Sequence, residues 1–134
     1  MTNVYVDLDG TLLDSRLDDE YREITKQYGE VVADKVYGTM YNDSLELNLA
    51  LWCRLLVLKE EGATIVAWTN RGESKSDMTF NNLAKCGVMS LFSGFIFCNG
   101  KKRTMSLKGG IVFENEYSNE VECAEFNFIP TFRI

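Results

Sequence analysis

The chain has 134 residues, which is enough for one domain with a substantial hydrophobic core. Its formal net charge of -6 argues against broad nonspecific binding to nucleic acid, because there is no stripe of lysine and arginine to neutralise phosphates. The sequence contains no histidine, which excludes histidine-based catalytic triads and histidine metal sites.

The cysteines and the apolar runs indicate the class of protein. Cys53, Cys86, Cys98 and Cys123 are far apart and include no Cys-x-x-Cys pair, so a zinc site is not expected. We interpret them as buried, reduced thiols of an intracellular protein. The N-terminus lacks a basic-then-apolar leader, and no apolar run approaches the length of about 18 residues that a membrane span needs. We therefore expect a cytoplasmic protein that does not enter a membrane.

The N-terminal stretch predicts a strand that ends in two acids. Residues 3–8 begin with β-branched and aromatic side chains, which favour a buried strand. Asp7 and Asp9 follow, on one side of the extended chain and roughly 6.5–7 Å apart, and a turn at Gly10 would bring both carboxylates around one point. Two converging acids repel each other unless a positive charge lies between them. Oxygen ligands of this kind favour Mg²⁺.

Two other interpretations of these acids stay open. Asp and Gly are common in solvated turns, where such a run needs no function. A calcium-binding loop would place Asp7 and Asp9 at its third and fifth positions. That alignment puts Tyr5 where the first acid belongs and Arg16 where a bidentate Glu belongs, and the preceding segment is strand-like rather than helical.

The run DLDGTL at residues 7–12, directly after an apolar strand, resembles the first motif of the haloacid dehalogenase superfamily. The resemblance implies that Asp7 is the nucleophile that becomes an aspartyl-phosphate. It implies that Asp9 protonates the leaving oxygen and then activates water. It also implies that a side-chain oxygen of Asp7 and the backbone carbonyl of Asp9 bind the metal. Aspartates at both positions favour phosphoryl chemistry over dehalogenation.

The stretch from about residue 16 to residue 42 is expected to form a small helical insert. One helix ending at Gly29 is predicted by apolar residues at helical spacing, namely Leu17, Tyr21, Ile24 and Tyr28. A second short helix fits the valines within residues 31–40. In haloacid dehalogenase proteins this slot holds a flap and, in some branches, a cap domain. The stretch is too short for a full helical cap, so a small lid and a surface excursion are equally good interpretations.

A longer helix and a strand are predicted next. Asp43 and Glu46 have the form of a capping box, and Gly62 ends the helix. Its core-facing stripe is predicted to be Leu45, Leu49, Trp52 and Leu56. Residues 64–68 form a continuous apolar run typical of a strand that is covered on both faces.

That strand ends in Thr69, Asn70 and Arg71, which resembles the second motif of the superfamily. A hydroxyl donor and a free backbone N–H at a strand's carboxyl end can hold a phosphoryl oxygen, so we assign this role to Thr69 with the Asn70 backbone. Arg71 either reaches a second phosphate or is solvated. A helix over residues 74–87 follows, opened by Ser74 and Asp77, with its inward side chains expected to be Met78, Leu83 and Ala84.

The third and fourth motifs are weaker. A strand over 92–98 precedes a basic cluster, in which Lys102 stands 12 residues before Glu114; Lys101 is the second candidate for the motif lysine and Lys108 the third. A strand over 110–113 then leads to Glu114 and Glu116, either of which is a candidate metal ligand, with Glu120 as a second acid. The family has Asp here, and Glu is one methylene longer. A short strand at 128–132 ends the chain, with Pro130 suited to an edge position.

Strands that alternate with helices predict a parallel sheet with right-handed crossovers. We therefore expect a single α/β domain over residues 1–134, with a three-layer Rossmann-like architecture and the motif turns gathered at one sheet edge. The expected function is a Mg²⁺-dependent phosphohydrolase whose substrate is a nucleotide or a nucleic-acid-end phosphate. Two alternatives are a catalytically weak binding or scaffold protein and a phosphotransferase.

Overall fold

The computed structural model describes residues 2–13, 16–36, 47–101, 107, 109–114 and 131–133. Within these residues a single parallel sheet has the strand order β3-β2-β1-β4-β5. Its strands are β1 (Asn3–Val6), β2 (Thr64–Thr69), β3 (Gly94–Phe97), β4 (Ile111–Glu114) and β5 (Thr131–Arg133). The predicted α/β class with a parallel sheet is therefore confirmed.

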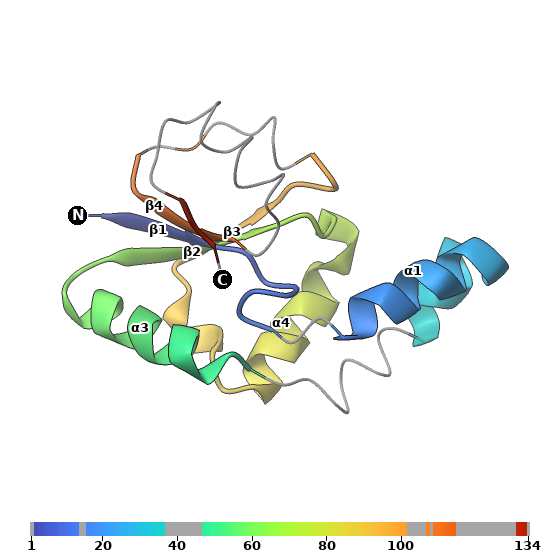
Figure 1. Ribbon diagram of the computed structural model, residues 1–134, viewed down its shortest axis with the longest axis horizontal. Coiled ribbons are helices and arrows are strands. Elements are labelled where there is room, and N and C mark those ends of the chain that lie inside the picture. Colours follow the sequence, from blue (N-terminus) through green and yellow to red (C-terminus); the bar gives the residue numbers. More distant parts are fainter. Residues whose placement is uncertain are drawn as a thin grey trace.

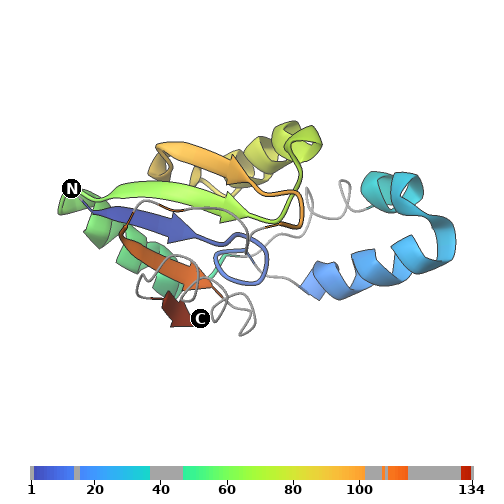
Figure 2. The same cartoon turned by 90° about the horizontal axis from the view of Figure 1, so that it is seen from above.

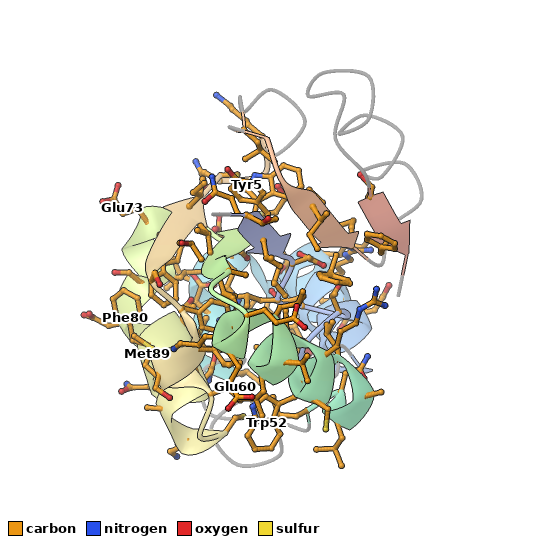
Figure 3. The ribbon with its side chains drawn as sticks, turned by 90° about the vertical axis from the view of Figure 1, so that its left-hand side faces the viewer. Tyr5, Trp52, Glu60, Glu73, Phe80 and Met89 are labelled. Carbon is orange, nitrogen blue, oxygen red and sulfur yellow. The ribbon has the colours of Figure 1, made fainter. Side chains whose placement is uncertain are left out.

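The two longer helices described in the main body cover the same face of this sheet. In Figure 1, α3 (Leu49–Glu60) and α4 (Ser76–Lys85) lie together below the strands. Side chains from β1, β2 and β4 form the larger core cluster with these helices, for example Val6, Ala67 and Phe113. Tyr5 points to the opposite face, as Figure 3 shows, and packs in a second cluster with Trp68 and Val112. The described residues include no helix that covers this second face (Figure 1).

All five strands occur where apolar runs predicted them, with shifted ends. Strand β1 stops at Val6, two residues before the predicted end, because the chain turns at Leu8 to Leu13. Strand β3 is shorter than the predicted 92–98, and β4 extends to Glu114. Strand β5 begins at Thr131 and lies at the edge of the sheet; Pro130 lies outside the described residues.

The predicted start of the helix over 43–62 is wrong. Helix α3 begins at Leu49, and the side chain of Asn48 caps it by accepting a hydrogen bond of 3.1 Å from the Leu51 backbone N–H. Leu47 precedes the cap and forms an antiparallel bridge with Leu13. The helix cannot extend back through a residue that is held extended against the turn after β1. The proposed capping box at 43–46 lies outside the described residues.

The predicted stripe on α3 is also wrong. Leu51 and Leu55 are buried, whereas Leu49 is 63% exposed and Leu56 is 44% exposed. Trp52 is half-buried and packs against the core cluster from the helix side of the sheet. The segment is apolar on nearly every side, so helical spacing alone does not select one stripe.

Truncation of two neighbouring leucines tests which side of α3 faces the core. We expect Leu55→Ala to lower the free energy of unfolding by about 2–5 kcal/mol, because it leaves a cavity in a fully buried site. Leu56→Ala removes the same atoms from a partly exposed site and should cost less than about 1 kcal/mol. Urea denaturation of both variants measures the difference. A larger loss at Leu56 would restore the stripe predicted from the sequence.

The helical insert projects beyond the carboxyl ends of the strands. Helix α1 (Arg16–Tyr28) matches the predicted helix, and a second helical segment covers residues 30–36. Figure 2 shows both at the end of the molecule toward which the strand arrows point. An ion pair of 3.0 Å between Asp34 and Lys75 joins the second segment to η1 (Glu73–Lys75). Residues 37–42 of the predicted insert lie outside the described residues.

Helix α4 is shorter than the predicted 74–87 and is preceded by the η1 turn. Leu83 is buried as predicted, but Ala84 is exposed and Met78 is only half-buried. The other buried side chains of this helix are polar: Thr79 and Asn82. Both side chains accept hydrogen bonds from Arg71.

Cysteine burial differs from the prediction at one position. Cys98 is buried and Cys86 is half-buried, but Cys53 is exposed on α3, and Cys123 lies outside the described residues. Burial raises the pKa of the Cys86 thiol. Within the part of the chain that the structure describes, no helix combines the length and the apolar character needed to cross a bilayer.

Candidate active site

Two buried carboxylates lie at the carboxyl ends of the neighbouring strands β1 and β4. Val6 pairs with Phe113 in parallel register, and the Asp7 backbone N–H donates to the Phe113 carbonyl at 3.0 Å. Asp7 and Glu114 are the next residues along β1 and β4. They are therefore neighbours, because adjacent strands of a sheet lie about 4.8 Å apart. Because side chains alternate along a strand, both follow Tyr5 and Val112 onto the same face. Asp7 is 6% exposed and Glu114 is 0% exposed.

The turn after β1 fixes the Asp7 carboxylate. Gly10 has a φ of 82°, which a glycine adopts readily, and this lets its N–H reach the Leu13 carbonyl at 2.8 Å. The turn folds Thr11 back over the strand end, where its hydroxyl donates to Oδ2 of Asp7 at 2.7 Å. Asp7 is thus held in orientation by a buried hydroxyl four residues further on.

Asp9 points to a different partner. Its two carboxylate oxygens accept from Nε and Nη2 of Arg71, at 2.9 and 2.7 Å. The Arg71 side chain is 4% exposed and the Asp9 side chain is 17% exposed. This is the bidentate geometry in which a guanidinium binds a carboxylate most specifically.

Arg71 is in turn bound to α4. Its Nη1 donates to Thr79 Oγ1 and to Asn82 Oδ1, both at 3.0 Å, and the Thr79 hydroxyl donates to the Lys75 carbonyl at 2.9 Å. These hydrogen bonds explain why α4 buries two polar residues, Thr79 and Asn82. The sequence had predicted instead that Ala84 faces inward. The interpretation of Arg71 as a solvated side chain is wrong, because it is buried against Asp9 and α4. That it reaches a second phosphate stays a prediction.

Thr69 ends β2 with a buried hydroxyl. Its Oγ1 accepts from the Arg71 backbone N–H at 3.1 Å, and a hydroxyl that accepts one hydrogen bond keeps its own hydrogen to donate. The loops after β2 and β3 are joined at this point, since the N–H groups of Cys98 and Gly100 donate to the carbonyls of Thr69 and Asn70. Asn70 itself is exposed.

The remaining predicted site residues are only partly covered by the structure. Lys101 follows β3, is exposed, and its backbone N–H donates to the Cys98 carbonyl. Lys102, Lys108 and Glu116 lie outside the described residues. The described site therefore consists of Asp7, Asp9, Thr69 and Glu114 at the carboxyl ends of three adjacent strands, with Arg71 as a member that sequence reasoning left unassigned.

The acids offer a hard-oxygen environment for a cation. Among the described residues, no three carboxylate or cysteine side chains converge into a self-contained metal cage. Mg²⁺ does not need one, because it is commonly held by one or two carboxylates together with water and substrate oxygens. The side chains of Asp7 and Glu114, with the Asp9 backbone carbonyl, supply donors of that type. The same set is unsuited to zinc, which favours nitrogen and sulfur ligands.

The arrangement of strands and helices is similar to several solved structures. A candidate beta-phosphoglucomutase from Thermotoga maritima has a TM-score of 0.71 and 15% identity, covering 99% of this chain and 85% of that one. A haloacid dehalogenase-like hydrolase from Streptococcus pneumoniae has a TM-score of 0.65 and 13% identity, covering 99% and 84%. A chain of a Pnkp1/Rnl/Hen1 complex has a TM-score of 0.67 and 18% identity, covering 100% of this chain and 46% of that one.

These similarities show that the chain has the haloacid dehalogenase-like fold, as the motif at residues 7–12 predicted. No family model and no curated protein matches the sequence.

Proposed function

We propose that the protein is a Mg²⁺-dependent phosphohydrolase that works through an aspartyl-phosphate on Asp7. The observation that carries the proposal is the position of two buried carboxylates, Asp7 and Glu114, at the carboxyl ends of neighbouring strands, with the hydroxyl of Thr11 fixing Asp7. In parallel α/β folds this edge is the usual ligand-binding position. The haloacid dehalogenase-like fold adds support.

Each residue has a distinct task in this mechanism. The Asp7 carboxylate attacks phosphorus, held in place by the hydrogen bond from Thr11. The hydroxyl of Thr69 and the backbone N–H of Asn70 donate to phosphoryl oxygens. Asp9 gives a proton to the leaving oxygen and then takes one from the water that cleaves the aspartyl-phosphate. A lysine after β3 offsets the negative charge, with Lys102 first and Lys101 second.

Asp7, Asp9 and a glutamate would hold the metal, and Glu114 is favoured over Glu116 by its position beside Asp7. When bound, Mg²⁺ supplies the positive charge that lets a phosphate anion approach two carboxylates, an effect worth several kcal/mol.

The proposed substrate is a nucleotide or the phosphate at a nucleic-acid end. The net charge of -6 disfavours long contacts with nucleic acid, but it leaves recognition of a single terminal phosphate open. One structural neighbour comes from a complex named Pnkp1/Rnl/Hen1. The described part of the insert is a pair of short helices rather than a full cap domain (Figure 2), and a site with little cap favours a bulky substrate.

A second candidate is a binding or scaffold protein that turns over poorly. It is favoured by Glu114, which stands where the family has Asp and which the fold buries completely. A phosphotransferase that passes the phosphoryl group to another acceptor would use the same residues.

The test is phosphate release by the wild-type protein from a panel of mononucleotides, 3′- and 5′-phosphorylated oligonucleotides and phosphopeptides, each with Mg²⁺ and with a chelator. Turnover that requires Mg²⁺ supports the phosphohydrolase, and the preferred member of the panel identifies the substrate class. No release from any member, together with Mg²⁺ binding by calorimetry, would support the scaffold instead.

A further inference from the structure

We infer that the outer face of helix α3 binds a second copy of this chain, and that the two α3 helices pack antiparallel across a two-fold axis at Cys53. The inference goes beyond the proposed function and does not depend on it, because it uses no residue of the candidate site. It gives a role to apolar side chains that the fold leaves uncovered.

The outer face of α3 is apolar over three turns. Leu51 and Leu55 turn toward the sheet and are buried. In Figure 1 the sheet lies above α3, so the opposite side of the helix points away from the body of the protein. The four apolar side chains on that side are all exposed: Leu49, Cys53, Leu56 and Val57. An exposed apolar patch of this kind is typical of a contact with another molecule.

The spacing of these side chains is symmetric about Cys53. Leu49 precedes Cys53 by four residues and Val57 follows it by four, so the three form one ridge along the helix. If a second α3 runs in the opposite direction across a two-fold axis at Cys53, Leu49 of each copy meets Val57 of the other. The small central side chain lets the two helices approach closely. A surface that matches itself in this way fits a second copy of the chain.

The charges at the ends of α3 favour the same antiparallel pairing. Its first turn contains no acidic residue, whereas Glu60 and Glu61 are exposed at its other end. In an antiparallel pair these glutamates lie beside the first turn of the other copy's helix, where the helix dipole is positive. A parallel pair would bring the glutamates of both copies together. An anionic lipid surface is a poorer partner, because it repels these glutamates and a net charge of -6.

Pairing through α3 leaves both candidate sites open. The helix begins at the carboxyl edge of the sheet, where the Asn48 backbone N–H donates to the Leu12 carbonyl at 2.8 Å, and it ends at the opposite edge, just before β2. In the antiparallel dimer the two sites therefore face opposite ends of the assembly. We expect monomer and dimer to have the same turnover, so dimerisation and phosphohydrolase activity can be tested separately.

Sedimentation equilibrium of the reduced protein over about 1–300 µM tests the inference, because a dimer with a Kd of about 1–100 µM dissociates within that range. A weak dimer is expected, since four apolar side chains cover less than the roughly 800 Å² per partner of a standard interface. Val57→Glu puts a charge into the ridge and should raise the Kd at least about 100-fold. Val31→Glu is the matched control: it makes the same change at an exposed valine of the insert and should leave the Kd at the wild-type value.

Two further measurements test the register. Leu49→Lys alone should also dissociate the dimer, whereas the double variant with Leu49→Lys and Val57→Glu places opposite charges against each other twice across the axis. It should bind itself at least about 10-fold more tightly than either single variant. A short bismaleimide should join two wild-type copies through their Cys53 thiols and should not join copies of Cys53→Ser. Far-UV circular dichroism and the urea midpoint should match the wild type in every variant, because each changed side chain is exposed.

Three results would overturn the inference: a wild type that is monomeric over the whole range, a dimer that Val57→Glu leaves intact, and a dimer that Val31→Glu weakens equally. A monomer that co-sediments with phosphatidylcholine vesicles would assign the outer face of α3 to a lipid surface and would overturn it as well. A wild type that dimerises as expected but releases no phosphate would overturn the proposed function and leave this inference standing.

Discussion

Asp7→Asn is expected to lower kcat for phosphate monoester hydrolysis by at least roughly 10⁴-fold, because an amide oxygen is a poor nucleophile at phosphorus. The replacement preserves the size of the side chain, and its amide oxygen can still accept from the Thr11 hydroxyl. The fold should therefore be retained. The measurement is steady-state phosphate release at saturating Mg²⁺. A second measurement is the mass of acid-quenched protein, which should carry one phosphoryl group in the wild type and none in the variant.

Asp77→Asn provides the matched control for this replacement. Asp77 lies in the first turn of α4, is exposed, and undergoes the same chemical change at a position outside the site. Its kcat and KM should equal those of the wild type. Wild-type turnover in Asp7→Asn would remove Asp7 from the mechanism, and an equal loss in both variants would point to a defect unrelated to nucleophilic attack.

Local sequence could predict the strands but not the helix contacts. A strand covered on both faces needs a short continuous apolar run, and such runs precede Asp7, Thr69 and Glu114 with little ambiguity. Helix α3 is different, because apolar residues occupy most of its surface and several stripes fit the helical period. Which stripe is buried depends on where the helix starts, and the start depends on a contact between Leu47 and Leu13 that is distant in sequence.

The same distinction applies to the candidate site. Residues that directly follow strands could be placed at one sheet edge from the sequence, because parallel strands end together. The bond between Arg71 and Asp9 joins residues 62 positions apart, and it requires α4 to present acceptors to the guanidinium. A signal for it is present in the sequence: Thr79 and Asn82 lie on the helix face next to Leu83, where apolar residues would be expected. Polar residues on a buried face need partners, and a nearby arginine is a natural one.

In the proposed mechanism, turnover depends on Glu114 as a metal ligand. Its side chain is one methylene longer than the Asp of haloacid dehalogenase proteins, but Glu114 and Asp7 are the residues that follow the last pair of the β1–β4 register, Val6 and Phe113, and both are buried. Two adjacent buried carboxylates are unfavourable when both are ionised, and a divalent cation relieves the repulsion. If Glu114 is a ligand, the metal should contribute both to activity and to the stability of the folded chain.

Glu114→Gln is therefore expected to weaken Mg²⁺ binding by at least about 100-fold, since a neutral amide replaces an anionic ligand. Calorimetric titration measures the affinity directly. A ligand that binds only the folded state raises its melting temperature, so the Mg²⁺-induced rise of the wild type should be largely lost in the variant. Glu73→Gln is the control, because Glu73 is exposed on η1 and points away from the body of the protein in Figure 3. Unchanged affinity in Glu114→Gln would exclude Glu114 as a ligand and favour Glu116, whereas no Mg²⁺ binding by the wild type would leave the paired acids without the cation on which the proposed mechanism depends.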